Sequence, residues 1–252
     1  MRLRALLAAL ILICAPVIAD EPPLKALVFD FAPWGYLEDG RPAGLNVAVF
    51  EALSRESGLP IEPILMPYQR MLALLEAGEG DLAIFFTSPE SQVIAHQIAS
   101  VYRLESVLLV RHDFNRAPDI SGLPPNLVVA TARGVRIDTI FDQAQTYINV
   151  PTNGGPHAAR LLLSGRVESI AGPYRPLLLL VEAAGGSRDD VKIFKSITVN
   201  EGWLQMSKNS MRLALKDRIT EAMARLEARG EIEPTVLTYI PDIRSKHDPV
   251  DD

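Results

Sequence analysis

Arginine and tyrosine side chains stand at two places in this chain where a small anion could be held. Tyr68 and Arg70 follow Pro67 at the start of a predicted helix, where a cation would add to the backbone amides of the helix N-terminus. Arg133 and Arg136 flank a glycine turn between a predicted strand and a predicted helix. A guanidinium binds a carboxylate through two parallel hydrogen bonds. The pattern predicts contacts to an anionic group, and the alternative is solvated arginines or structural ion pairs.

Aromatic and hydroxyl side chains that could line a binding cleft occur where predicted strands end. Trp34 and Tyr36 lie in the loop after the predicted strand over residues 24–31. Phe86 and Thr87 close a later strand, and Tyr174 follows another. An aromatic ring offers a large apolar contact area, tyrosine adds a polar tip, and a threonine hydroxyl can donate a hydrogen bond. The alternative for each residue is that it covers the surface or packs in the core.

Catalytic and metal-binding patterns are missing from the sequence. It has no catalytic triad, no paired carboxylates at an informative spacing and no Cys/His cluster with metal-ligand spacing. Glu90 and His157 are the side chains that could transfer protons, but a lone histidine near a helix start is more often solvated. We therefore expect a protein that is not an enzyme and that has no cofactor or metal.

The N-terminal segment has the pattern of a secretory signal peptide over residues 1–19. Two arginines precede an apolar run over residues 6–17, which is too short to span a bilayer of about 30 Å as a helix. Small residues then allow cleavage near Ala19, so we expect export to the periplasm. The alternatives are an uncleaved anchor or a lipoprotein attached at Cys14, the only cysteine.

The charge and size of the chain limit its class. The formal net charge is −6, whereas nucleic-acid binding needs a basic stripe. About 230 residues would remain after cleavage, enough for one large domain or two small ones. Nucleic acid is therefore excluded as a partner.

Apolar segments and glycine stops predict two α/β units. The first alternates strands and helices in the order β-α-β-α-β, over residues 24–31, 45–57, 61–66, 70–77 and 81–86. The second repeats this alternation over residues 126–130, 138–146, 147–150, 157–164, 167–171 and 176–184. Further strands are predicted over 106–110, 191–199 and 203–206, and a long amphipathic helix over 211–228. The fold class is therefore α/β, with mostly parallel strands.

Two segments share one local design. Residues 74–81 and 162–168 each contain a helix end, a glycine cap and an acidic residue before a buried strand. The repetition suggests one α/β unit in each of two lobes.

Together these pieces resemble the type II periplasmic solute-binding proteins, in the family 3 branch that serves amino-acid importers. The segments that carry the resemblance are 31–34, 44–47, 75–81, 87–90, 107–110 and 165–168, and they occur in the family's order and spacing. The resemblance implies two lobes joined by crossing strands, with a ligand cleft between them. It implies that residues 20–111 and 203–244 form lobe 1, that residues 112–202 form lobe 2, and that residues 245–252 are a disordered tail.

The sequence departs from the family where amino-acid binders carry their charged anchors. The position of the arginine that binds the ligand carboxylate is Ser91, and the position of the aspartate that binds the ammonium is Gly172-Pro173. Losing both anchors argues against an ordinary α-amino acid. With the arginines named above, it favours an anionic or neutral polar solute.

The resemblance implies a monomeric periplasmic protein that delivers a small-molecule ligand to an inner-membrane ABC-type permease. Two other functions remain open. One is a sensory or accessory subunit that reports ligand binding to a periplasmic partner. The other is a dehydratase-like enzyme on the same fold, which would need an acid or base in the cleft.

Overall fold

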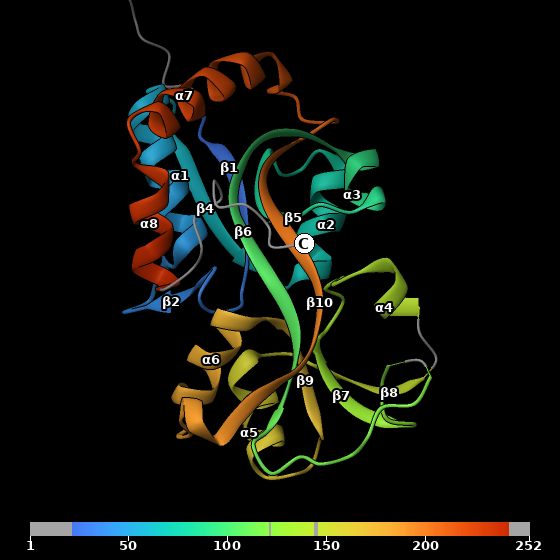
Figure 1. Ribbon diagram of the computed structural model, residues 1–252. Coiled ribbons are helices and arrows are strands. Elements are labelled where there is room, and N and C mark those ends of the chain that lie inside the picture. Colours follow the sequence, from blue (N-terminus) through green and yellow to red (C-terminus); the bar gives the residue numbers. More distant parts are fainter. Residues whose placement is uncertain (1–21, 121, 144–145, 242–252) are drawn as a thin grey trace, which may run out of the picture.

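The computed structural model describes residues 22–120, 122–143 and 146–241, which form two α/β lobes (Figure 1). The signal peptide predicted over residues 1–19 and the tail predicted over 245–252 lie outside the described residues. Among the described helices, none combines the length and the apolar character needed to cross a membrane.

One eight-stranded sheet runs through both lobes in the order β4-β1-β5-β10-β6-β9-β7-β8. Its strands are β1 (Leu24–Phe29), β4 (Ile61–Met66), β5 (Leu82–Phe86), β6 (Ala95–Arg111), β7 (Leu127–Ala132), β8 (Tyr147–Thr152), β9 (Ser169–Pro173) and β10 (Val191–Ser207). Strands β4-β1-β5 and β9-β7-β8 are parallel, as the predicted alternation of strands and helices requires. A separate hairpin consists of β2 (Tyr36–Glu38) and β3 (Arg41–Ala43).

Strands β6 and β10 join the two lobes. Each has 17 residues, and they pair antiparallel along their whole length. At about 3.4 Å per residue, each strand spans roughly 55 Å. The register shifts between Ile193 and Lys195, between Ser196 and Thr198, and at two later points. Such irregularities bend and twist a strand, which lets the pair follow both lobes (Figure 1).

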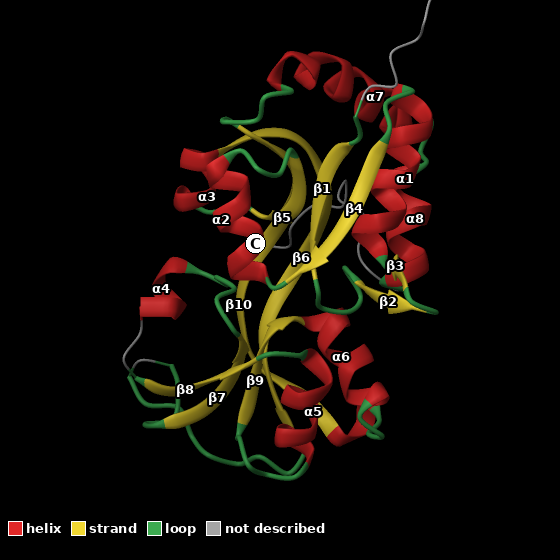
Figure 2. Ribbon diagram, turned by 180° about the vertical axis from the view of Figure 1, so that it is seen from behind, coloured by secondary structure: helices red, strands yellow, loops and turns green. Residues whose placement is uncertain are grey.

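Helices cover both faces of each half of the sheet (Figure 2). Lobe 1 contains α1 (Leu45–Ser57), α2 (Tyr68–Ala77), α3 (Pro89–Ile94), α7 (Lys216–Ala228) and α8 (Ile232–Tyr239), and lobe 2 contains α4 (Thr139–Gln143), α5 (Gly155–Leu163) and α6 (Tyr174–Ala183). Two 3-10 turns are η1 (Arg188–Asp190) and η2 (Leu213–Leu215). Helices α1 and α2 end at Gly58 and Gly78, which adopt left-handed conformations with φ of 65° and 74°. The predicted glycine stops are confirmed at both positions.

The lobes have separate hydrophobic cores. In lobe 1, the buried cluster includes Leu27, Phe50 and Ile84, and the C-terminal helices close it. In lobe 2, neighbouring residues of β6 pack on opposite faces of the sheet, Leu109 against α5 and α6 and Leu108 on the side of α4. This alternation is the strand period of two, and it lets one strand serve both layers.

The repeated helix-glycine-acid segment has the same structural role in each lobe. In lobe 1, Asp81 accepts a hydrogen bond from the backbone N–H of Lys25, the second residue of β1 (2.8 Å). In lobe 2, Glu168 accepts one from the backbone N–H of Val128, the second residue of β7 (3.0 Å). Asp81 directly precedes β5, and Glu168 directly precedes β9. Each acid therefore connects the start of that strand to the first strand of its lobe.

Four predicted elements differ from the structure by more than small shifts of their bounds. The strand predicted over 106–110 is part of the longer β6, and the strands predicted over 191–199 and 203–206 are one strand, β10. The predicted helix over 211–228 begins as the 3-10 turn η2 and becomes α-helical at Lys216, and α8 follows as a separate helix. Polar residues alternate with apolar ones along β6 and β10. Frequent polar residues are also typical of loops, so the sequence did not reveal the full length of these two strands.

An ionic cluster holds the C-terminal segment on lobe 1. Glu56 in α1 accepts hydrogen bonds from Arg225 in α7 and from Arg229 just beyond it. The hydrogen bonds from Arg229 and Arg225 lower the pKa of Glu56 from 4.5 to about 2. The native state therefore favours the ionised carboxylate more strongly than the unfolded state does.

Replacing Glu56 with glutamine should lower the melting temperature at pH 7. A depressed pKa stabilises the native state above the unfolded pKa, and this stabilisation is lost as the pH falls from about 4.5 through about 2. The difference between wild type and Glu56→Gln should therefore shrink across that window. Thermal unfolding by circular dichroism from pH 7 to pH 2 measures it, with Glu51→Gln as a control at an exposed position on the same helix. A difference that stayed constant down to pH 2 would contradict the ionic explanation.

Candidate functional site: the cleft between the lobes

Two adjacent pockets lie between the lobes, where the parallel strands of both lobes end. This is the expected position for a site in an open α/β sheet. We call the first the inner chamber, with a cavity volume of about 60 Å³. Its lining residues are Phe29, Phe31, Trp34, Tyr68, Phe85, Phe86, Tyr102, Ala130, Thr131, Ala132, Val135, Ile137, Thr152, Ala158, Ile170, Ala171, Gly172, Pro173, Pro176, Leu177 and Leu180.

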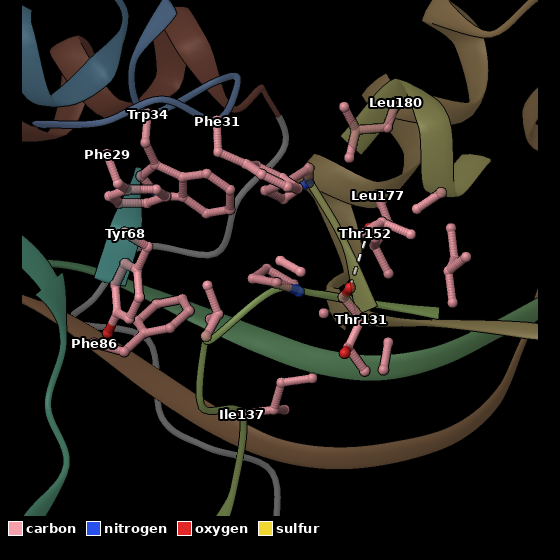
Figure 3. A pocket seen from close by; sticks show the side chains of 18 of the residues that line it. Phe29, Phe31, Trp34, Tyr68, Phe86, Thr131, Ile137, Thr152, Leu177 and Leu180 are labelled. Carbon is pink, nitrogen blue, oxygen red and sulfur yellow. Dashed lines mark hydrogen bonds between the residues drawn. The ribbon is translucent and has the colours of Figure 1, made fainter. Parts of the chain in front are cut away.

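Aromatic rings form the lobe 1 wall of the inner chamber (Figure 3). Trp34 lies 5.4 Å from Phe29 and 5.9 Å from Phe31 between ring centroids. Phe86 meets Trp34 edge to face at 6.4 Å, and Tyr68 meets Phe29 in the same way at 5.7 Å. Edge-to-face pairs at these spacings are favourable beyond the area they bury. The wall is therefore held by its own ring contacts before any ligand enters.

Aliphatic and small residues form the lobe 2 wall opposite these rings (Figure 3). Its hydroxyl groups are occupied: Thr131 donates to the side-chain oxygen of Asn149 (2.8 Å), and Thr152 donates to the backbone carbonyl of Thr131 (3.1 Å). Leu177 and Leu180 reach the chamber from α6. The lobe 2 side thus offers mainly carbon surface to a ligand.

Two polar atoms of lobe 1 are buried at the rear of the aromatic wall. Burial raises the pKa of Tyr102, while the neighbouring indole of Trp34 opposes that rise. Trp34 itself is 4% exposed, and its Nε1–H makes no hydrogen bond of ordinary geometry with a described residue. The Tyr102 phenol is therefore neutral, and the chamber carries no charge on this side.

The second pocket, which we call the outer pocket, is polar and has a volume of about 220 Å³. It shares Tyr68, Phe86 and Ile137 with the inner chamber, so the two pockets are adjacent. Its lining residues are Tyr68, Phe86, Thr87, Ser88, Pro89, Arg136, Ile137, Asp138, Asp142, Gln143, Thr198 and Asn200. Lobe 1, lobe 2 and strand β10 all contribute to it.

Both carboxylates of the outer pocket bind the backbone of the turn into α4. Asp138 Oδ1 accepts from the N–H groups of Ile140 and Phe141, both at 2.9 Å. Asp142 Oδ2 accepts from the N–H of Ile137 at 3.0 Å. Burial raises the pKa of Asp142, and the backbone hydrogen bond and Arg136 oppose that rise. Arg136 is exposed at the same pocket and is its cationic group among the described residues.

The structure brings together five of the nine residues that the sequence singled out. Trp34 lines the inner chamber, Tyr68 and Phe86 line both pockets, and Thr87 and Arg136 line the outer pocket.

The other four lie away from the two pockets. Tyr36 is half-buried in β2, and Arg70 is exposed on α2. Arg133 is exposed and donates to the side chain of Asn153 (2.5 Å). Tyr174 packs against the lobe 2 core, with the guanidinium of Arg175 5.4 Å from its ring centroid.

The positions where amino-acid binders carry charged anchors have other roles here. Ser91 is buried and exchanges hydrogen bonds with Ser88 in a capping box at the start of α3, through Ser88 N–H to Ser91 Oγ (2.9 Å) and Ser91 N–H to Ser88 Oγ (3.1 Å). Gly172 and Pro173 end β9 and line the inner chamber. One anchor position is therefore used for helix capping, and the other is an apolar wall.

Sequence reasoning missed most of the chamber. Phe29, Phe31 and Tyr102 were not singled out, nor were the aliphatic residues of lobe 2. Phe29 and Phe31 could have been found, because they stand at the carboxyl end of the first predicted strand. The alanines and leucines could not, because a residue that lines a dry pocket has the same sequence signal as a core residue.

A hydrogen bond crosses the mouth of the cleft. Gln69 Nε2, at the start of α2 in lobe 1, donates to the backbone carbonyl of Gly134 in lobe 2 (3.1 Å). Gly134 has φ of 76° and packs against the Gln69 side chain, so a Cβ at this position would collide with the Gln69 amide. The contact joins the two lobes directly.

A metal site is not indicated. Among the described residues, no group of three or more His, Cys, Asp or Glu side chains is arranged to hold a metal ion.

Comparison with known proteins agrees with this geometry. The sequence matches the family model of bacterial extracellular solute-binding proteins, family 3, over residues 26–242. A search of curated protein sequences finds no match.

Solved structures with the same two-lobed fold include binding proteins and a sensor domain. A histidine kinase sensor domain with similarity to periplasmic binding proteins superposes with a TM-score of 0.75 at 17% identity, covering 90% of this chain and 99% of that one. A mutant of ArgBP from T. maritima gives 0.72 at 16% identity, covering 86% and 94%. The arginine-, lysine-, histidine-binding protein ArtJ from Geobacillus stearothermophilus gives 0.71 at 16% identity, covering 88% and 96%. At these identities the likeness establishes the fold.

Removing the contact across the cleft should open the ligand-free protein. An exposed hydrogen bond contributes about 0.5–1.5 kcal/mol, so Gln69→Ala should shift the balance between closed and open forms about two- to tenfold. Gly134→Ala should open it further, because the added Cβ displaces Gln69 and the positive φ disfavours alanine. Small-angle X-ray scattering would show a larger radius of gyration. In the Gln69→Ala background, Gly134→Ala should add less, and an equal effect in both backgrounds would contradict this account.

Proposed function

Because this chain belongs to the bacterial extracellular solute-binding proteins of family 3, we propose that it is a periplasmic binding protein that closes over one small molecule. The observation that carries the proposal is the pair of adjacent pockets between the lobes, each lined by residues of both lobes. A ligand that contacts both walls stabilises the closed form by its differential affinity. The proposed ligand contacts are Trp34, Tyr68, Phe86, Thr87 and Arg136.

The lobes move as two bodies in this proposal, divided as 20–111 with 203–244 and as 112–202. The distribution of the cores supports two bodies, but Val107, Leu108 and Leu109 pack in the lobe 2 cores, so we move the proposed boundary on β6 from residue 111 to between Leu104 and Val107. Buried residues of the lobe 1 core run to Leu104 and resume at Leu204, and those of the main lobe 2 core run from Val107 to Val191. The residues between these limits lie on β6 and β10, which makes the two strands the hinge.

The ligand in this proposal is neutral or anionic at its polar end and is not an ordinary α-amino acid. Arg136 offers a guanidinium to that end, while the two carboxylates beside it already accept backbone hydrogen bonds. The two anchor positions of amino-acid binders hold Ser91, which caps a helix, and Gly172-Pro173, which form an apolar wall. A zwitterion would find neither of its usual partners there.

Delivery to an inner-membrane ABC-type importer is the proposed use of the bound ligand. One structural neighbour is described as the substrate-binding protein of an amino acid ABC transporter, which supports this use. A sensory role is the second candidate, supported by the histidine kinase sensor domain and by a domain of BvgS from Bordetella pertussis. Uptake of labelled ligand by cells with and without the gene would separate them, since a sensory subunit would leave uptake unchanged.

A cognate solute should raise the melting temperature of the protein, purified from residue 20 after unfolding and refolding to remove any carried ligand. A ligand at a hundred times its dissociation constant stabilises the native state by about 2.7 kcal/mol. The solutes to test are mono- and dicarboxylates, aromatic acids, amino acids, sugars and polyamines, and a neutral or anionic compound should give the largest shift.

Arg136→Gln should reduce the shift given by an anionic ligand, because the guanidinium lines the outer pocket. Arg133→Gln is the matched control, since that arginine lies in the same turn but pairs with Asn153. If no solute class shifted the melting temperature, the binding function itself would be wrong.

A further inference from the structure

We propose that the inner chamber is the specificity-determining part of the cleft, and that it takes the uncharged, apolar end of the ligand. The ligand class is then a branched-chain or aryl-substituted carboxylic acid, or its neutral amide, without an α-ammonium group. This inference rests on the proposed binding function and names the kind of solute that the function serves.

The chamber wall carries no formal charge to pair with a ligand charge. Among the described residues that line it, none is Asp, Glu, Lys, Arg or His. Its neutral hydroxyls on lobe 2 are already engaged, with Thr131 bound to Asn149 and Thr152 bound to the carbonyl of Thr131. An ammonium group placed in this chamber would lose its hydration without gaining an anionic partner.

The aromatic wall is suited to an apolar group. Phe29, Trp34 and Phe86 present ring faces and edges held at 5.4 Å and 6.4 Å from one another. Opposite them, Leu177 and Leu180 add aliphatic surface from α6 (Figure 3). Removing an alkyl or aryl group from water into such a site is favourable in proportion to its apolar area.

The polar end of the ligand would then extend from the inner chamber toward the outer pocket. Tyr68, Phe86 and Ile137 line both pockets and therefore stand where the two adjoin. On the outer-pocket side lie Arg136 and the hydroxyl of Thr87. A carboxylate or amide one or two bonds beyond the apolar end would reach the outer pocket and keep its hydrogen bonds.

The volume of the chamber limits the size of the apolar end. It measures about 60 Å³, which suits a branched alkyl end, whereas a dry engineered cavity that binds benzene measures about 150 Å³. A phenyl ring would therefore enter only with the lobes slightly further apart than in this structure.

Substitution of Pro173 tests whether the absence of a carboxylate in the chamber wall determines the choice of ligand. It lines the chamber, precedes α6 and has φ of −62° and ψ of 127° as the N-cap of that helix. Asp and Asn are both favourable N-cap residues, so either can replace Pro173 with the helix retained. Pro173→Asp adds a carboxylate to the chamber wall, and Pro173→Asn is the uncharged control of nearly the same shape.

The experiment measures dissociation constants by titration calorimetry for two matched pairs of probes, 4-methylpentanoate with leucine and 3-phenylpropanoate with phenylalanine. Each pair differs only in the α-ammonium group. Wild type should bind the acid without the ammonium at least about tenfold more tightly in the better-fitting pair. The α-ammonium lies on the carbon between the apolar end and the carboxylate, so it would be buried beside Tyr68, Phe86 and Ile137, which offer it no carboxylate. Propanoate, which lacks the apolar end, should bind more weakly than 4-methylpentanoate. The amide 4-methylpentanamide should still bind.

Pro173→Asp should reverse the preference toward the amino acid, and Pro173→Asn should retain the wild-type order. The inference is overturned if wild type binds leucine or phenylalanine as tightly as the matched acid, or if propanoate binds as tightly as 4-methylpentanoate. It is also overturned if a sugar or polyamine stabilises the protein and none of these probes does, an outcome that leaves the binding function intact. If the Pro173→Asp variant fails to fold, the wild-type pairs still decide the matter.

Discussion

The antiparallel pairing of β6 with β10 is the constraint on which the rest of the structure depends. These two strands are the longest of the sheet and belong to both lobes. Strand β10 pairs with β5 in lobe 1, and β6 pairs with β9 in lobe 2. Each set of parallel strands is therefore attached to the same ladder. The attachment turns the carboxyl ends of β1 and β5 toward those of β7 and β9, and the cleft is the space where they meet.

The same ladder explains how the protein can be both specific and mobile. A continuous pair of strands resists separation, because its backbone hydrogen bonds lie in the ladder, but its register shifts allow bending and twist. Each lobe keeps its own core and its own acid that ties the lobe's first strand, Asp81 in lobe 1 and Glu168 in lobe 2. In the proposed closing motion, bending of β6 and β10 would change the spacing of the two walls without disturbing either core.

Local structure was largely predictable from the sequence, and the contents of the cleft were not. The 45–57 and 61–66 segments were predicted with the observed bounds, since apolar spacing and a glycine stop are local signals. Alignment with the family identified Ser91 and Gly172-Pro173 as the positions of the missing anchors. In the structure, Ser91 caps α3, and Gly172-Pro173 line the inner chamber. In contrast, Arg70 and Arg133 had the right residue type for an anion site but lie away from both pockets. Whether a side chain points into a cleft depends on the packing of distant elements, and a single sequence does not record that packing.

In the proposed ligand cleft, the chamber wall at Gly172 and Pro173 has no charged anchor, and this changes what limits affinity. In a cleft that binds a zwitterion, two buried ion pairs must compensate the desolvation of four charges, so small errors of geometry are costly. Here the inner surface is carbon, and its contribution grows with the apolar area that the lobes cover as they close. Such a cleft tolerates variation in its ligand, because dispersion and burial depend weakly on direction, whereas hydrogen bonds do not. In the proposed mode of binding, selectivity then has to come from exclusion. An ammonium group entering the chamber would find no carboxylate, so the preferred solute would be one that leaves its polar end outside when the lobes close.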